Sequence, residues 1–268
     1  MKIFDLSLTM EPNRGQPMAV EIEYHSHEEG GKAMLPFFAC NAEDLPRGMG
    51  WSVEKVTLST HDGTHVDAPW HYFPESEGKK ARSIDELPIE WFFADGVVLD
   101  MRHKLQGSGV TVDDCTAALK KIGYTLKKGD IVCIQTGADK LWGTSKYFGA
   151  GVGMIRESTL WLIEQGVRVI GTDAWGLDRP FWAIKEEFQK TKDKSIIWCA
   201  HYAGIEKEYC QIEKLANLDQ LPQPYGFKIA CFPIKVRNAS GGWARVAAIF
   251  EDNEEAKIPK TTGGRTIK

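Results

Sequence analysis

Apolar and polar residues alternate along several short stretches of the chain, and this pattern predicts β-strands. Between Trp51 and Ser59, the apolar residues Val53, Val56 and Leu58 are separated by charged or polar ones. A repeat of two places every other side chain on the same face of a strand. Further strands are predicted over residues 3–8, 96–100, 129–137, 167–171, 195–199, 227–233 and 244–250, with a turn at residues 241–242 before the last.

Helices are predicted where apolar residues recur between capping signals. Thr111 and Asp114 resemble a capping box at the start of a helix that ends at Gly123. Residues 156–165 and 181–192 are two further predicted helices, and residues 85–87 form a helical turn. The pattern indicates one mixed α/β domain over residues 1–268, with many strands and about three or four helices.

Two segments show no regular alternation of apolar and polar residues. Residues 10–50 are rich in proline, glycine and charge, and long loops of this kind inside compact domains are usually functional. The apolar residues 34–38 and Trp51 either pack together or line a pocket for an apolar group, and the sequence leaves both open. Residues 138–153 form a second irregular, aromatic-bearing loop, and the polar, lysine-rich tail after Glu251 is predicted to be an arm or a loose end.

The composition is that of an ordinary globular protein, and it excludes some functions. Hydrophobic residues make up 43% and charged residues 26% of the 268 residues, and the formal net charge is -4. A general nucleic-acid binder needs a basic face, so no nucleic-acid partner is expected. No apolar run of about 18 residues predicts a membrane span. The first residues lack the apolar core of a signal peptide, which favours a cytoplasmic protein whose six scattered cysteines are reduced.

The highest density of potential metal-binding side chains lies directly after the strand predicted at residues 51–59. His61, His65, Asp67 and His71 follow the spacing His-x3-His-x-Asp-x3-His. Imidazole and carboxylate groups are ligands for a divalent metal such as zinc or manganese. His65 and Asp67 are two residues apart, so in an extended segment they point to the same side. Gly63 permits the bend that would bring His61 to them, which predicts a strand end or loop folded around an ion.

Other candidates follow predicted strands elsewhere. His201 lies just after the strand predicted at 195–199, and Glu213 lies twelve residues later; neither means much in isolation. Asp173 and Asp178 follow the strand predicted at 167–171, and they could be metal ligands, hydrogen-bond anchors for a metal-binding histidine, or turn residues. A structural or anchoring role is favoured for both.

The run from His61 to His71 resembles the His-x-Gly-Thr-His-x-Asp-x-Pro-x-His signature of the Putative cyclase family, which includes bacterial kynurenine formamidase (arylformamidase) and isatin hydrolase. Looser similarity extends along the chain, at residues 4–7, 135–137 and 171–173, and in the pair His201 and Glu213. The resemblance implies a swivelling β/β/α fold with a small barrel-like β core flanked by helices, assembled as a homodimer or homotetramer.

The resemblance also implies roles for the site residues. His61, His65 and Asp67 would hold a first divalent metal, Zn or Mn. Asp67 would bridge to a second metal held by His201 and Glu213, and His71 would be the catalytic acid or base. Isatin hydrolases resemble this pattern with a single manganese and a Gln where this chain has Glu213, so one or two metals per chain are expected. No organic cofactor is indicated.

These parts predict a metal-dependent hydrolase that cleaves a small amide, either an N-formyl aryl amide or a lactam, with metal-activated water. His71 would transfer a proton between water and the leaving group. Two alternatives stay open: a lactone or ester hydrolase or polyketide-type cyclase that uses the same site, and a non-catalytic binding module in which the metal is structural.

Overall fold

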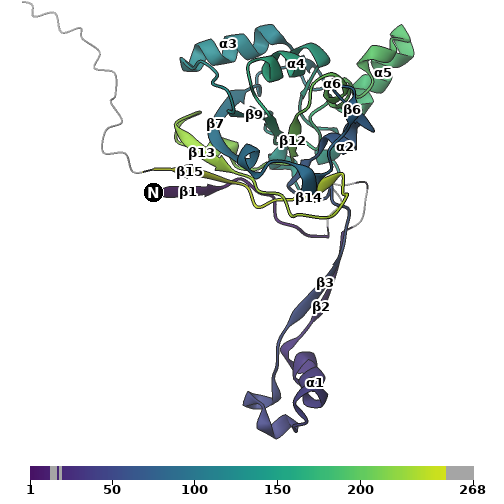
Figure 1. The fold of residues 1–268 in the computed structure, drawn as a ribbon, viewed down its shortest axis with the longest axis vertical. Coiled ribbons are helices and arrows are strands. Elements are labelled where there is room, and N and C mark those ends of the chain that lie inside the picture. The colour runs from purple at the N-terminus through teal and green to yellow at the C-terminus, as the bar shows by residue number, and fades with distance from the viewer. Residues whose placement is uncertain (13–16, 18–19, 252–268) are drawn as a thin grey trace, which may run out of the picture.

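The computed structural model describes residues 1–12, 17 and 20–251, and its centre is a curled nine-stranded sheet (Figure 1). Across the sheet, the order is β1 (Lys2–Asp5), β15 (Ala247–Phe250), β13 (Phe227–Ala230), β7 (Phe93–Asp100), β9 (Ile131–Gln135), β11 (Val169–Thr172), β12 (Cys210–Glu213), β4 (His65–Asp67) and β14 (Gly241–Trp243). Strands β7, β9, β11 and β12 are parallel, and antiparallel strands continue the sheet on both sides. Parallel strands are normally covered on both faces, which explains why all five residues of β9 are buried.

Six α-helices occur in the described part of the chain, more than the three or four predicted. They are α1 (His27–Phe38), α2 (Pro69–Tyr72), α3 (Val112–Ile122), α4 (Arg156–Glu164), α5 (Phe181–Thr191) and α6 (Cys199–Glu206). The predicted cap of α3 is confirmed: Thr111 accepts a hydrogen bond from Asp114 N, and Gly123 ends the helix in the left-handed conformation. The longest helix among the described residues, α1, has 12 residues, too few to cross a membrane.

Two hydrophobic cores lie on opposite faces of the sheet. Along β9, Val132 and Ile134 pack beneath α3 and α4, whereas Ile131 and Cys133 contribute to the core shared with β13 and β15. This alternation is the period of two expected for a strand buried on both faces. The helix-flanked β core and the mixed α/β class are therefore as predicted.

Residues 20–57 form an arm that leaves the body of the molecule (Figure 1). Strands β2 (Glu21–His25) and β3 (Val53–Thr57) pair as an antiparallel ribbon, and α1 lies at its far end. The prediction of an irregular loop over residues 10–50 is wrong here, because Ser26 and Glu29 form a capping box that starts α1 in spite of two glycines inside the helix. The apolar residues at 34–38 lie on this arm and not at the site described below.

Two other predictions near the site are wrong. Residues 195–199 are not a strand: Lys194–Ile196 forms a 3-10 turn, and α6 begins at Cys199. Residues 241–242 are not a turn but belong to β14, which pairs with β4. A Cβ atom on Gly241 would lie 2.8 Å from His61 Cε1, so glycine is needed for close approach to the site rather than for a turn. The tail after Glu251 lies outside the described residues.

The remaining short elements complete the fold. Two more ribbons pair β5 (Glu75–Ser76) with β6 (Lys79–Lys80) and β8 (Gly109–Val110) with β10 (Gly153–Met154). The irregular loop at 138–153 contains two 3-10 turns, Ala138–Leu141 and Tyr147–Gly149. This loop lies at the carboxyl end of β9, on the side where the candidate site forms.

Candidate metal and catalytic site

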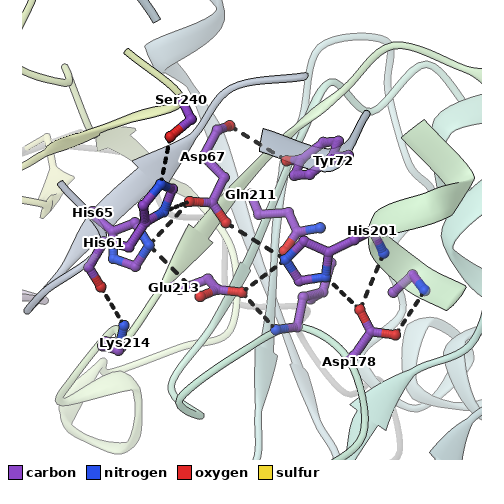
Figure 2. A network of polar contacts seen from close by, with 12 residues as sticks. His61, His65, Asp67, Tyr72, Asp178, His201, Gln211, Glu213, Lys214 and Ser240 are labelled. Atoms are coloured by element: carbon purple, nitrogen blue, oxygen red, sulfur yellow. Dashed lines mark hydrogen bonds and ion pairs between the residues drawn. The ribbon is translucent and has the colours of Figure 1, made fainter. Parts of the chain in front are cut away.

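Strand pairing explains why side chains far apart in sequence meet. β4 lies between β12 and β14, and the register places His65 directly opposite Glu213. Directly opposite residues in an antiparallel pair point to the same face. His65 and Asp67, two residues apart on β4, therefore share that face with Glu213, as Figure 2 shows. The prediction that His65 and Asp67 point to one side is confirmed.

Asp67 lies at the centre of the cluster and is fully buried. Its Oδ1 lies 2.7 Å from His61 Nδ1 and 3.0 Å from His65 Nε2, and its Oδ2 lies 3.8 Å from His201 Nε2. Glu213 completes the group, with its carboxylate oxygens 3.7 Å from His65 Nε2 and 3.5 Å from His201 Nε2. The structure thus brings together all five residues predicted as metal ligands.

Two buried polar atoms in this cluster have no hydrogen-bond partner: His65 Nε2 and Asp67 Oδ2. His65 Nδ1–H donates to the Gly63 carbonyl at 2.9 Å, which leaves a bare lone pair on Nε2. Leaving a buried polar atom unsatisfied costs about 1–3 kcal/mol, and such groups are expected to have a partner. A nitrogen lone pair and a carboxylate oxygen both bind cations, so these residues fit a divalent metal.

Two sets of side chains have the compactness of a metal site: His61, Asp67 and His71, and His65, Asp67 and Glu213. Within each set the potential ligand atoms lie within 4.8 Å of one another. Asp67 belongs to both sets, as expected of a bridging carboxylate. The other members differ from the predicted sets, because His71 and not His65 accompanies His61, and His65 and not His201 accompanies Glu213. The geometry does not separate His71 from the ligands, since its ring stacks on His61 with centroids 4.0 Å apart.

Hydrogen bonds to Asp178 fix the position of His201. Asp178 accepts hydrogen bonds from Ala200 N at 2.9 Å and His201 N at 3.1 Å, and it also bonds His201 Nδ1 (Figure 2). A carboxylate behind a histidine ring directs the other ring nitrogen to a metal, here Nε2 towards Asp67 and Glu213. Trp198 stacks on the same ring with centroids 4.2 Å apart. The favoured anchoring role of Asp178 is therefore supported by its contacts.

Asp173 has a different place. It accepts hydrogen bonds from Thr136 N, Thr136 Oγ1 and Gly137 N, so it fixes the turn after β9. This arrangement agrees with the structural role favoured for it.

The cluster alters the ionisation of its members. Burial opposes ionisation of Asp67, but the imidazoles of His71, His65 and His61 hold the pKa of that carboxyl well below its usual range. Burial lowers the pKa of His71 to about 4. Burial, together with the charge of Asp67, raises the pKa of Glu213. Burial also opposes the charging of His201, but its hydrogen bond to Asp178 and the nearby carboxylate of Asp67 prevail and raise its pKa to about 10.

Lys214 was not predicted from the sequence. Its side chain is 2% exposed, and Nζ donates to the His61 carbonyl at 2.6 Å. Burial lowers the pKa of this amine. In the sequence, the only indication of a role for Lys214 is its position between Glu213 and Leu215, at the end of a buried strand. A lysine at that position could equally well lie on the surface.

A cavity of about 350 Å³ opens onto the cluster. His61, His71, His201 and Glu213 contribute to its lining. So do four aromatic side chains, Phe148, Trp175, Phe181 and Trp198, and the charged residues Asp62, Asp178, Arg179 and Lys214. Trp175 contacts Phe148 and Phe181 edge to face, with centroids 4.7 and 5.4 Å apart. A cavity of this size that combines aromatic walls with polar groups is typical of a small-molecule site.

Comparisons with known proteins find a matching family and similar sequences. Residues 4–179 match the family described as Putative cyclase. A kynurenine formamidase from Erythrobacter litoralis is 27% identical over 204 residues, which cover 75% of this chain and 78% of that protein.

Solved structures show the same fold. Isatin hydrolase A from Ralstonia solanacearum superposes with a TM-score of 0.74 at 24% identity, covering 93% of this chain and 92% of that one. Isatin hydrolase A from Labrenzia aggregata, bound to benzyl benzoate, superposes with a TM-score of 0.71 at 25% identity and covers 93% of each chain.

Proposed function

Because this chain belongs to the Putative cyclase family of hydrolases, we propose that it is a metal-dependent enzyme that cleaves a small amide, either an N-formyl aryl amide or a lactam. The observation that carries the proposal is the pair of unpartnered buried atoms, His65 Nε2 and Asp67 Oδ2, beside an open cavity. The names of the similar proteins, kynurenine formamidase and isatin hydrolase, support the choice of an amide bond. We also propose the family's swivelling β/β/α architecture for the sheet and its helices.

The ligands proposed are His61, His65 and Asp67 for a first ion, with Asp67, His201 and Glu213 for a second. A bound divalent ion, Zn or Mn, supplies a Lewis acid that polarises a carbonyl group and lowers the pKa of water from about 16 to about 7. The protein contributes the fixed geometry of these ligands.

His71 is proposed as the proton carrier. Burial lowers the pKa of His71, so its imidazole is neutral at pH 7 and keeps a nitrogen lone pair for a proton. It lines the cavity, and its ring contacts those of His61 and Trp198, with centroids 4.0 and 5.3 Å away. From this place it can take a proton from water and return it to a leaving nitrogen. The aromatic walls offer flat faces for a planar substrate ring.

The test compares three substrates on one preparation: a formyl anilide, isatin and an aryl lactone. Purified protein is stripped with chelator, and activity and metal content are measured before and after Zn²⁺ or Mn²⁺ is restored. We expect hydrolysis of the formyl anilide or isatin that is lost on stripping and recovered with metal. Full activity in metal-free protein would refute metal dependence, and activity on the lactone alone would assign the enzyme to ester chemistry.

A further inference from the structure

Lys214 is a buried lysine that lines the cavity and has no part in the mechanism proposed above. In the described part of the chain its ammonium makes one hydrogen bond, to the His61 carbonyl at 2.6 Å, and no ion pair (Figure 2). The carboxylates of Glu213, Asp67 and Asp62 influence its ionisation from beyond ion-pair distance. An ammonium has three N–H donors, and a buried charge is normally paired. Two donors of Lys214 are therefore left for a ligand.

The backbone of Lys214 is held in an unusual conformation. Its φ angle is +59°, in the left-handed region that a residue with a Cβ atom rarely adopts. Its N–H donates to the Ala174 carbonyl at 3.1 Å, and its own carbonyl accepts a hydrogen bond from Thr64 Oγ1. Glycine would adopt this conformation without strain, so the lysine is present at a conformational cost. Outliers of this kind, fixed by their surroundings, are concentrated at functional sites.

The ammonium of Lys214 lies against the aromatic part of the cavity wall. Its Nζ is 5.0 Å from the centroid of the Trp175 ring, which contacts Phe148 and Phe181. Nε1 of the same indole is buried and has no hydrogen-bond partner. Flat apolar faces bind an aryl ring, whereas N–H donors bind an anion. The wall therefore combines a surface for an aryl group with donors for an anionic substituent.

The second lysine or arginine that lines the cavity is Arg179, and its guanidinium is already engaged. Its Nε donates to the Gly107 carbonyl at 2.8 Å, and its Nη1 pairs with Glu187 at 2.5 Å. A ligand would have to compete with a carboxylate for this group. Lys214 is therefore the better placed of the two cations to bind an anion.

We propose that Lys214 determines specificity by binding a carboxylate of the substrate, so that the preferred substrate is an aryl amide with an anionic substituent. The ammonium donates a charge-assisted hydrogen bond to the carboxylate, and the two charges pair. A neutral analogue leaves the ammonium unpaired in its buried position and binds more weakly. The choice of an aryl amide rests on the proposed function, whereas the preference for an anion does not depend on amide cleavage.

The first test measures binding without turnover, by calorimetry on the full chain as purified with its metal. The ligands are benzenesulfonate and methyl phenyl sulfone, which share a ring and differ in charge. We expect the sulfonate to bind about 10–100-fold more tightly, because a hydrogen bond to a charged group contributes that much. Lys214→Met should remove this preference, and Lys214→Arg should keep most of it.

A matched control removes a positive charge elsewhere. Lys228 lies on β13, pairs with Asp95 at 2.5 Å and does not line the cavity. Lys228→Met should therefore keep the parent's preference for the sulfonate. Elemental analysis and circular dichroism check that every variant retains its metal content and its fold.

The second test measures turnover of formanilide and of 2-formamidobenzoate, which adds a carboxylate to the same aryl amide. The parent's kcat/KM should favour the benzoate, and Lys214→Met should lower that preference about 10–100-fold, mainly through KM. The ratio of the two substrates cancels any general effect of losing the bond to the His61 carbonyl.

Equal affinity of the unaltered protein for the sulfonate and the sulfone overturns the proposal, and this result needs no variant. A Lys214→Met protein that loses activity equally on both substrates also overturns it and makes Lys214 a positioning residue for His61. An anion preference that depends on Lys214, in a protein that cleaves neither amide, supports the anion site and refutes the proposed amide hydrolysis.

Discussion

Replacing Asp178 with alanine should loosen His201 and weaken metal binding together. Asp178 is 5% exposed, and its carboxylate accepts hydrogen bonds from Ala200 N, His201 N and His201 Nδ1. The two backbone donors belong to the first turn of α6, where no intrahelical acceptor is available. In the alanine variant both are left buried without a partner, and the ring of His201 loses the contact that orients Nε2.

The magnitude follows from these contacts. A buried donor without an acceptor costs about 1–3 kcal/mol, so two such donors cost about 2–6 kcal/mol of unfolding free energy. For a chain of this size, each kcal/mol lowers the melting temperature by roughly 2–4 °C. Loss of a hydrogen-bond partner behind a metal-binding histidine typically lowers metal affinity about 10–100-fold. We therefore expect a clear fall in melting temperature and in metal affinity.

The assay is differential scanning calorimetry with and without added metal, followed by metal titration well below the melting temperature. Asp193→Ala is a matched control, because Asp193 also caps a turn, through Ser195 N at 2.8 Å, but is exposed and is not among the candidate site residues. That variant should change stability by about 1 kcal/mol or less and leave metal affinity unaltered. An Asp178→Ala protein that binds metal as tightly as the parent would refute the reasoning.

Four further predictions concern the same site and its surroundings. Asp67→Ala should abolish metal binding, measured by elemental analysis, because this carboxylate belongs to both candidate ligand sets. His71→Ala should lower turnover about 10²–10⁴-fold while metal content stays intact, and loss of metal in this variant would make His71 a ligand. Chelation should lower the melting temperature, since a ligand at about 100 times its Kd stabilises the folded state by about 2.7 kcal/mol. Gly204→Ala should destabilise the protein by about 1–3 kcal/mol, measured by urea unfolding, because the added Cβ would lie 2.4 Å from Tyr72 Cδ2 against the cluster.

The sequence by itself determined the features that depend on neighbouring residues. The spacing of His65 and Asp67 places both on one side of an extended strand, whatever surrounds it. Thr111, Asp114 and Gly123 bound a helix through local hydrogen bonds and a left-handed residue, and the structure has that helix. The mixed α/β class followed from the same local patterns.

Only the tertiary structure decided features that depend on distant partners. His201 lies on a helix rather than after a strand, because Asp178, 23 residues earlier, caps the first turn. Gly241 is a strand residue beside His61, 180 positions away in sequence, where a side chain would not fit. The ribbon of the arm is not apparent from residues 10–50, because β2 finds its pairing partner only in β3. Local patterns fix conformation over a few residues, whereas the meeting of His65 with Glu213 depends on the strand order and register of the sheet.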